Sequence, residues 1–362
     1  MKTFTIGARR RTAVAVTALA LAATGCSSGD SSPKSSSPDT TPSDAQSSQL
    51  DMTPQDLDVS LGAKTLIYAP VYLAQSEGYF KKQALTVNVV QVQASASIQA
   101  LTGGSVDLAL VASQTYIRAK LKGVDAIAIQ ATTAADANGF VLANKKWMDS
   151  KGVNPSSSLQ DRLATLDGST IGYTTAGAIT QIHAQWLLRK AGLKPDAAKL
   201  IQVGVGNATS AAIERGDIDL GFFTPPEVQR LVADGKAEIL INGLKEFSEF
   251  EDQPYSIVLA TPKWLKDNPA TATRFSRAIA EAIAYIQQDP KGAAAKLAST
   301  FPDVAPDQME AAVDAMLPTF GEGGLMSKEM WDNAVNMAAD TGHLDSKPDT
   351  AEGGLWTNEY NK

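Results

Sequence analysis

The feature that most constrains this chain is an internal repeat with an offset of 112 residues. Residues 95–129 align with residues 207–241 without a gap, and roughly nine of about 35 positions are identical. The identical pairs include Gly104 and Gly216, Asp107 and Asp219, and Arg118 and Arg230. Self-similarity of this kind indicates that one structural unit occurs twice.

Each copy alternates short apolar runs with segments of helix length. We predict strands at 86–92, 106–111 and 126–129 in the first copy, and at 199–203, 218–223 and 238–241 in the second. Further strands are predicted ahead of the copies, at 64–68 and 170–173, and each leads into a helix that ends near a glycine, Gly78 or Gly192. This alternation predicts βαβ units, and therefore an α/β fold of two lobes, each with a mostly parallel sheet.

A second similarity indicates how the chain passes between the lobes. Residues 140–147 and 257–264 are nearly the same octapeptide, placed on either side of the second copy. We interpret them as two crossovers that form a two-segment hinge, and helices predicted at 269–288, 290–299, 306–317 and 328–341 then complete the first lobe. The expected organisation is lobe I (55–142 plus 257–345), lobe II (143–256) and a C-terminal tail (346–362).

The composition favours binding over catalysis. The 362-residue chain has one cysteine and two histidines, His183 and His343, so we expect no internal disulfide and no zinc site. A formal net charge of −7 provides no basic surface for nucleic acid. We therefore predict no catalytic residue, no metal, no cofactor and no nucleic-acid partner.

The N-terminal residues predict export. Residues 1–25 combine a basic start with an apolar run, Thr12 to Ala23, that is too short to span a membrane. Removing this signal takes away four positive charges and changes the net charge from −7 to −11. Residues 26–54 are rich in Ser, Pro, Asp and Thr, so we expect a flexible tether. The alternative is an ordinary secretory signal with a cysteine that happens to lie near its cleavage site. Because of Arg9-Arg10, the export route, Sec or twin-arginine, stays open.

Several motifs resemble one family. Residues 66–82, 100–108, 166–172 and 213–220 are similar to segments of the nitrate/sulfonate/taurine-type binding proteins of ABC importers, such as the SsuA-like proteins. Residues 23–28 resemble the lipobox of bacterial lipoproteins, which implies lipidation of Cys26 and attachment to the extracytoplasmic face of the cell membrane. The resemblance implies a monomeric solute receptor with a periplasmic-binding-protein-like (type II) clamshell fold, and an ABC permease and its ATPase as partners.

The same family has an enzyme branch, the thiamine-pyrimidine synthases. A cysteine-rich motif and an active-site histidine are expected there, whereas this body has no cysteine and no histidine in the loops of the first lobe. A synthase, and a solute-sensing lipoprotein that is not coupled to transport, remain the alternatives.

Ligands of open α/β sheets bind beyond the carboxyl ends of the strands, so two facing lobes should enclose one cleft. Hydroxyl, amide and glycine residues in these loops can hold a polar group together with helix N-termini, although each can also be an ordinary N-cap. The candidate ligand-binding residues are Tyr68, Tyr72, Ser95, Ser97, Ser113, Gln114, Thr174, Thr175, Gly177, Asn207, Thr224 and Glu227.

The charge of these loops gives a further hint about the ligand. They hold no Lys, Arg or His, which favours a sulfonate held by dipoles, or a neutral or zwitterionic solute, over a small inorganic anion. Glu227 either receives an amine or begins the helix after Pro225-Pro226. His183 is expected to be a packing residue.

Overall fold

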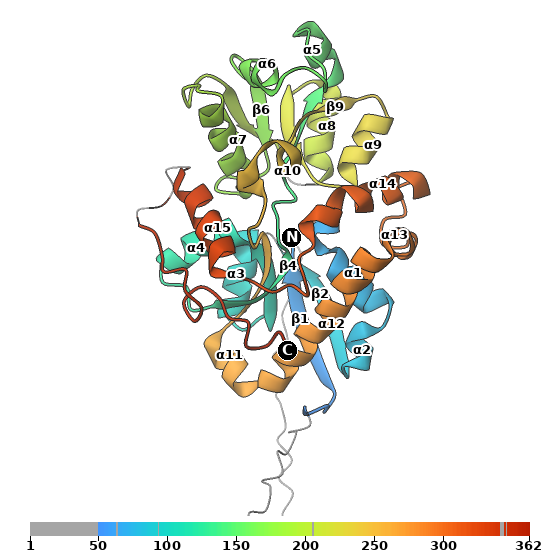
Figure 1. Cartoon of the computed structure of the whole chain (residues 1–362), viewed down its shortest axis with the longest axis vertical. Coiled ribbons are helices and arrows are strands. Elements are labelled where there is room, and N and C mark those ends of the chain that lie inside the picture. Colours follow the sequence, from blue (N-terminus) through green and yellow to red (C-terminus); the bar gives the residue numbers. More distant parts are fainter. Residues whose placement is uncertain (1–49, 63, 93, 205, 341–343, 345) are drawn as a thin grey trace, which may run out of the picture. The chain divides into compact units, whose positions relative to one another are not determined.

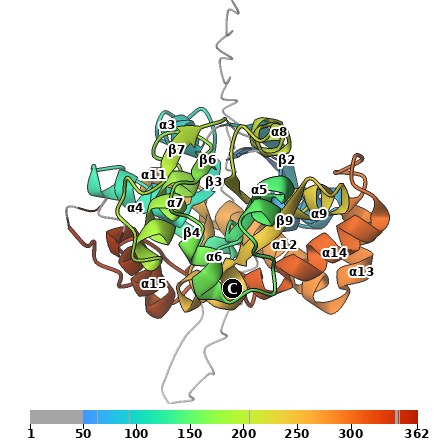
Figure 2. The same cartoon turned by 90° about the horizontal axis from the view of Figure 1, so that it is seen from above.

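The computed structural model describes residues 50–362 except for 63, 93, 205, 341–343 and 345. The predicted signal, Cys26 and most of the tether lie outside this range. Two five-stranded sheets form the body, each with helices on both faces (Figures 1 and 2). None of the helices in the described ranges is long and apolar enough to cross a membrane.

The two sheets have the same strand order. The first is β2 (Leu85–Gln91), β1 (Gln55–Leu61), β3 (Leu108–Ala112), β10 (Ser256–Ala260) and β4 (Ile127–Thr133). The second is β7 (Lys199–Gln202), β6 (Thr170–Tyr173), β8 (Leu220–Phe223), β5 (Phe140–Asn144) and β9 (Ala237–Asn242). In each sheet one strand, β10 or β5, is antiparallel to its neighbours and the other strands share one direction. The predicted two-lobed α/β fold with mostly parallel sheets is confirmed, and we call the sheets with their helices lobe I and lobe II.

Helices cover both faces of each sheet. Those of lobe I are α1 (Ala69–Ser76), α2 (Tyr79–Lys82), α3 (Ala94–Thr102), α4 (Ser113–Leu121), α11 (Pro262–Asp267), α12 (Pro269–Gln288), α13 (Pro290–Leu297), α14 (Pro306–Met316) and α15 (Lys328–Asp340). Those of lobe II are α5 (Lys145–Ser150), α6 (Leu159–Ala164), α7 (Ile179–Lys190), α8 (Asn207–Arg215) and α9 (Glu227–Ala233), and α10 (Gly243–Glu246) lies in the segment that returns to lobe I. Short 3-10 turns are η1 (Leu66–Tyr68), η2 (Ser248–Phe250) and η3 (Leu317–Thr319). Apolar clusters pack on both faces of the lobe I sheet and around the lobe II sheet.

The repeated aspartate has the same structural role in both lobes. Asp107 Oδ2 accepts a hydrogen bond from the backbone N–H of Asp58 at 2.9 Å, and Asp219 Oδ2 accepts one from that of Thr170 at 2.7 Å. Each carboxylate therefore joins the start of β3 or β8 to the neighbouring strand β1 or β6. This shared contact accounts for the presence of aspartate at both positions of the repeat.

The two similar octapeptides are also equivalent in structure. Each forms the antiparallel strand and the helix that follows it, β5 with α5 and β10 with α11. Asn144 Oδ1 accepts the N–H of Trp147 at 3.1 Å, and Thr261 Oγ1 accepts the N–H of Trp264 at 3.2 Å, so both helices have a side-chain N-cap. Because β5 lies wholly in lobe II, the chain leaves lobe I before residue 140, and the expected boundary after residue 142 falls inside a strand.

The crossings are the segments just before these strands, residues 134–139 and 243–255. Backbone hydrogen bonds join them, from Asp136 N to Phe250 O at 2.8 Å and from Gly243 N to Gly139 O at 2.8 Å. A Cβ atom on Gly139 would lie 2.6 Å from the Phe250 ring, so this close approach requires a glycine. We call these paired segments the hinge.

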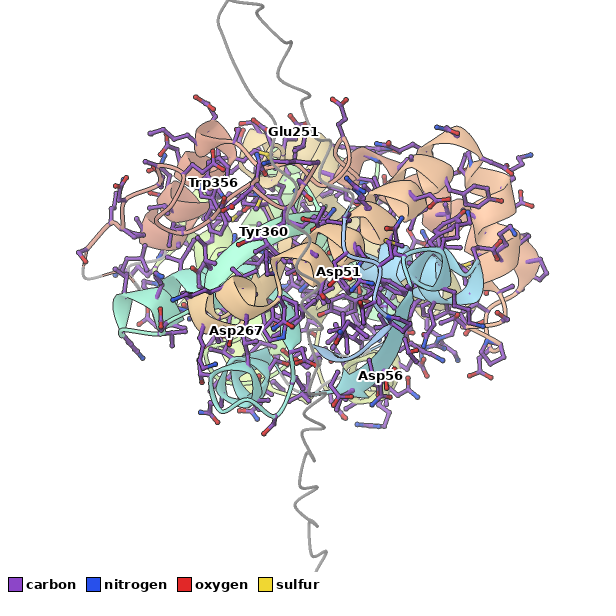
Figure 3. All side chains as sticks on the ribbon, turned by 90° about the horizontal axis from the view of Figure 1, so that it is seen from below. Asp51, Asp56, Glu251, Asp267, Trp356 and Tyr360 are labelled. Carbon is purple, nitrogen blue, oxygen red and sulfur yellow. The ribbon has the colours of Figure 1, made fainter. Side chains whose placement is uncertain are left out.

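Two predictions about lobe I are corrected. The strand expected at 64–68 is absent, because Leu66–Tyr68 form η1 and the first strand is Gln55–Leu61. Residues 346–362, set apart as a tail, instead pack on lobe I. Leu355 and Trp356 are buried, and Trp356 forms an isolated β-bridge with Ala128 of β4. Figure 3, which views the molecule from below, labels Trp356 and Tyr360.

Candidate ligand pocket

A cavity of about 830 Å3 lies between the two lobes and is lined by both of them and by the hinge. In lobe I the lining comes from the segment after β1, the start of α4 and the turn between α13 and α14. In lobe II it comes from the segments that follow β6, β7 and β8. The lining polar side chains include Lys64, Thr65, Tyr68, Thr115, Asn138, Thr174, Thr175, Thr180, Asn207, Thr209, Ser210, Glu214, Thr224, Glu227, Arg230, Tyr255, Thr300 and Asp303.

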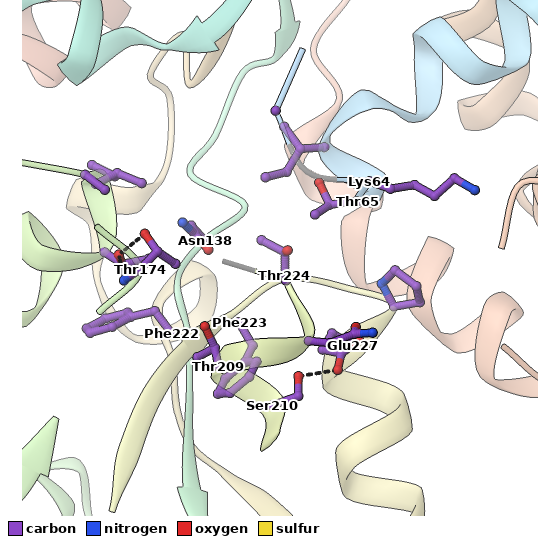
Figure 4. Close-up of a pocket in the computed structure, with 18 of the residues that line it drawn as sticks. Lys64, Thr65, Asn138, Thr174, Thr209, Ser210, Phe222, Phe223, Thr224 and Glu227 are labelled. Atoms are coloured by element: carbon purple, nitrogen blue, oxygen red, sulfur yellow. Dashed lines mark hydrogen bonds between the residues drawn. The ribbon is translucent and has the colours of Figure 1, made fainter. Parts of the chain in front are cut away.

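Hydroxyl groups of lobe II face this cavity in different states of hydrogen bonding (Figure 4). Thr174 and Thr180 bond to each other, with 2.9 Å between their hydroxyl oxygens, and Thr209 Oγ1 donates to Gly204 O at 3.0 Å. Thr224 is only 8% exposed, and its hydroxyl has no hydrogen-bond partner within the described residues. An unpaired hydroxyl in a largely buried side chain is a group that a bound ligand can satisfy.

Two helices begin at the cavity. Neither α7 nor α8 has a side-chain N-cap, and Ile179, Thr180 and Asn207 of their first turns line the cavity. The first N–H groups of a helix have no partner within the helix and carry partial positive charge. These ends therefore favour an anionic or strongly polar part of a ligand.

Glu227 forms a charged network at one side of the cavity. Its Oε1 accepts hydrogen bonds from the Ser210 hydroxyl and from Arg230 Nη2, the second at 2.7 Å. Arg230 also contacts Glu214 at 3.0 Å and Asp234 at 3.2 Å, so three carboxylates share one guanidinium. Although burial lowers the pKa of Arg230, the hydrogen bonds that it donates to Glu227 and Glu214 outweigh this effect and raise that pKa. The cluster has an excess of negative charge, which suits a ligand that donates from nitrogen.

Aromatic residues and the hinge supply the remaining walls. Burial raises the pKa of the Tyr68 phenol, and its oxygen accepts the N–H of Gly62 at 3.3 Å. Burial, followed by the charge of Asp136, raises the pKa of Tyr255 well above its usual value. Both phenols are therefore neutral at physiological pH, and Tyr68 and Tyr255 offer rings and hydroxyls rather than charge.

Seven of the residues singled out in the sequence line this cavity. They are Tyr68, Thr174, Thr175, Gly177, Asn207, Thr224 and Glu227. Glu227 also begins α9, as one of its two expected roles requires, and its contact with an amine stays a prediction.

Four of the other five, Tyr72, Ser97, Ser113 and Gln114, do not line it. Tyr72 packs edge-on against Phe301, with ring centroids 5.8 Å apart. Ser97 is fully buried and donates to Val92 O at 3.1 Å, while Ser113 donates to Gln114, whose side chain bonds Gln253 of the hinge at 2.8 Å. The side chain of Ser95 lies outside the described residues.

The structure also brings in residues that the sequence did not single out. Lys64 and Arg230 line the cavity, whereas the expected lining loops hold no cation. Lys64 is exposed, and its side chain extends away from the other labelled residues in Figure 4. Asn138 comes from the hinge, and residues 300–304 come from the turn before α14. No group of residues suited to hold a metal ion occurs in the part of the chain that the structure describes.

Comparison with known proteins places this geometry in a family. The chain is 22% identical over 286 residues to the putative binding protein YtlA of Bacillus subtilis (strain 168), covering 77% of this chain and 81% of that protein. It is 26% identical over 239 residues to a 4-amino-5-hydroxymethyl-2-methylpyrimidine phosphate synthase of Aspergillus parasiticus, covering 63% of this chain and 66% of the synthase.

Among solved structures, a protein of Bordetella bronchiseptica RB50 matches with a TM-score of 0.71 and 26% identity, over 84% of this chain and 95% of that one. The alkanesulfonate-binding protein SsuA of Xanthomonas axonopodis pv. citri, bound to MOPS, matches with a TM-score of 0.65 and 17% identity, over 81% and 95% of the two chains. These likenesses confirm the periplasmic-binding-protein-like fold. The model of the family described as NMT1/THI5 like matches residues 67–293, which is more than half of the sequence, and the chain therefore belongs to this family.

Proposed function

We propose that this chain is the extracytoplasmic solute-binding component of an ABC importer and that it binds a small organic solute between its lobes. The observation that carries the proposal is the cavity of about 830 Å3, whose walls come from both lobes and the hinge. A solute that contacts both lobes stabilises the closed form over the open one, which is how a hinged receptor couples binding to closure.

The lining also suggests the kind of solute. A cavity of this volume is in the range that holds organic ligands and is much larger than an inorganic anion requires. The starts of α7 and α8 suit a polar or anionic group, and the excess negative charge near Glu227 suits a nitrogen donor. Sulfonates such as taurine and pyrimidines of the thiamine type offer such groups.

A thermal-shift panel tests this proposal. Taurine, an alkanesulfonate, hydroxymethylpyrimidine and nitrate are each added to the purified chain. We expect one of the organic solutes to raise Tm by several degrees, since a ligand at about 100 times its Kd stabilises the folded state by about 2.7 kcal/mol. A shift with nitrate alone, or with none of the four, contradicts the assigned ligand class.

The alternative activity is that of the pyrimidine synthases among the relatives, which are 22–26% identical over about two thirds of this chain. Among the described residues, the cavity lining contains neither cysteine nor histidine, and His183 is fully buried beside the hinge. A nucleophilic thiol or an imidazole base is thus not among the side chains that would touch a bound solute. This observation favours binding without chemistry.

We also propose that Cys26 carries a lipid that holds the protein at the membrane. The wild type expressed in a bacterium is expected to incorporate radiolabelled palmitate and to sediment with membranes, because a diacylated cysteine provides stable anchoring. Cys26→Ser is expected to abolish both, whereas Ser27→Ala, the neighbouring control, retains them. Palmitate incorporation in Cys26→Ser contradicts the assignment.

A further inference from the structure

Two arginines at equivalent positions of the repeat make different contacts. Arg118 lies near the end of α4 in lobe I, and Arg230 lies near the end of α9 in lobe II. Arg230 is bound by three carboxylates of its own lobe. Arg118 has no carboxylate partner among the described residues, and its Nη2 donates instead to the backbone carbonyl of Gly177 in lobe II. The arginine at this repeat position therefore forms ion pairs within lobe II in the second copy, and links the two lobes in the first copy.

The acceptor belongs to a loop that forms the wall of the cavity. All five residues from 174 to 178 line it. Gly177 has φ +76°, a conformation that favours glycine, and its N–H donates to Gln181 Oε1 at 2.7 Å. This glycine is thus held through its N–H by lobe II and through its carbonyl by lobe I.

In the described part of the chain, the other hydrogen bonds between the lobes involve no charged group. Leu66 N donates to Pro225 O at 3.2 Å, and Gln229 Nε2 of α9 donates to Ala311 O of α14 at 3.4 Å. Arg118 is part-buried, and burial lowers the pKa of its guanidinium. A partly desolvated cation without a carboxylate depends on its remaining acceptor, which here is a carbonyl of the opposite lobe.

We propose that Arg118 is a positioning residue for solute binding, which holds the 174–178 loop against lobe I and so populates the closed form before the solute arrives. The bond from Arg118 to Gly177 requires the present spacing of the lobes, so it stabilises the closed form and not an open one. The apparent Kd for a solute is inversely proportional to the closed fraction, so a larger closed fraction gives a lower apparent Kd.

The test measures the distance between the lobes in the ligand-free full chain. Cys26→Ser removes the single cysteine, and Gln99→Cys in α3 with Lys194→Cys beyond α7 then place one exposed spin label on each lobe. Pulsed electron resonance gives the distribution of distances. Arg118→Ala is expected to raise the ratio of open to closed molecules about 10-fold, the change expected for one hydrogen bond to a charged group.

Lys120→Met provides the matched control on the same helix, because the Lys120 ammonium donates to Ala126 O at 2.8 Å within lobe I. This control is expected to keep the wild-type distances. A thermal melt establishes that Arg118→Ala is folded. Unchanged distances in Arg118→Ala, or an equal shift in Lys120→Met, would overturn the proposal, and neither result depends on the identity of the solute.

Discussion

Replacing Asp136 by alanine is expected to lower the free energy of unfolding by about 1–3 kcal/mol, the cost of leaving its buried partner without a polar contact. Asp136 belongs to the first crossing of the hinge, and its Oδ2 lies 2.8 Å from His183 Nε2 of α7. Both side chains are fully buried, and the two atoms are at ion-pair distance without hydrogen-bond alignment. The His183 ring packs between Phe222 and Phe250, with centroids 5.6 and 5.1 Å away. In the variant, the imidazole would therefore stay buried between these rings without a polar partner.

A double-mutant cycle measures the interaction itself. Urea unfolding is compared for Asp136→Ala, His183→Ala and the double variant, with Glu251→Ala as an exposed acidic control in the second crossing. We expect the double variant to be more stable than the sum of the single losses predicts, because the two residues interact directly. Additive losses, or a loss below about 1 kcal/mol for Asp136→Ala, would show that the pair does not stabilise the hinge.

The second large effect is expected at the cavity wall of lobe II. The triple variant Thr174→Ala, Thr175→Ala and Thr224→Ala removes three lining hydroxyls, two of which have no protein partner in the described residues. If each hydroxyl forms a hydrogen bond to the solute worth about 1–1.5 kcal/mol, the Kd rises by about 100- to 1,000-fold. Isothermal titration with the solute found in the panel measures this change.

A control variant separates this effect from a general loss of stability. Thr86→Ala, Thr102→Ala and Thr273→Ala together remove three hydroxyls of lobe I that do not line the cavity. This variant is expected to bind with the wild-type Kd. Equal affinities for the cavity triple variant and the wild type would mean that the solute binds elsewhere.

The repeat explains why so much of the fold was predictable. Asp107 and Asp219 are the same residue type at equivalent positions, and each joins two neighbouring strands, so a hydrogen bond that occurs in both lobes corresponds to an identity in the repeat. The two octapeptides match because each is an inserted strand followed by a capped helix. Their exact role was harder to predict, because a sequence does not show which sheet an extended segment joins.

The first strand shows where local pattern fails. The apolar run at 64–68 is too short for periodicity to distinguish a strand from a helical turn, and it forms η1. The real strand, Gln55–Leu61, alternates Leu57, Val59 and Leu61 with polar residues and looks like the end of the tether. The offset of 112 residues predicts the true position of this strand, because it aligns β6 with residues 58–61.

The candidate site was predictable only where it follows the repeat. Loops after β6, β7 and β8 line the cavity, whereas the lobe I candidates Ser97, Ser113 and Gln114 are buried and form hydrogen bonds within the protein. Residues 300–304 belong to neither copy, so no internal comparison pointed to them. Tertiary packing of the C-terminal helices brings that turn to the cavity.

The central claim is that the chain holds a small organic solute in this cavity and does not transform it. Native mass spectrometry of the purified chain with the organic solute from the panel tests it most directly. The bound molecule is then released and its mass is measured. We predict one solute per chain, released with unchanged mass, and loss of the complex in the cavity triple variant. A released molecule of altered mass, or a complex that persists in that variant, would contradict the account.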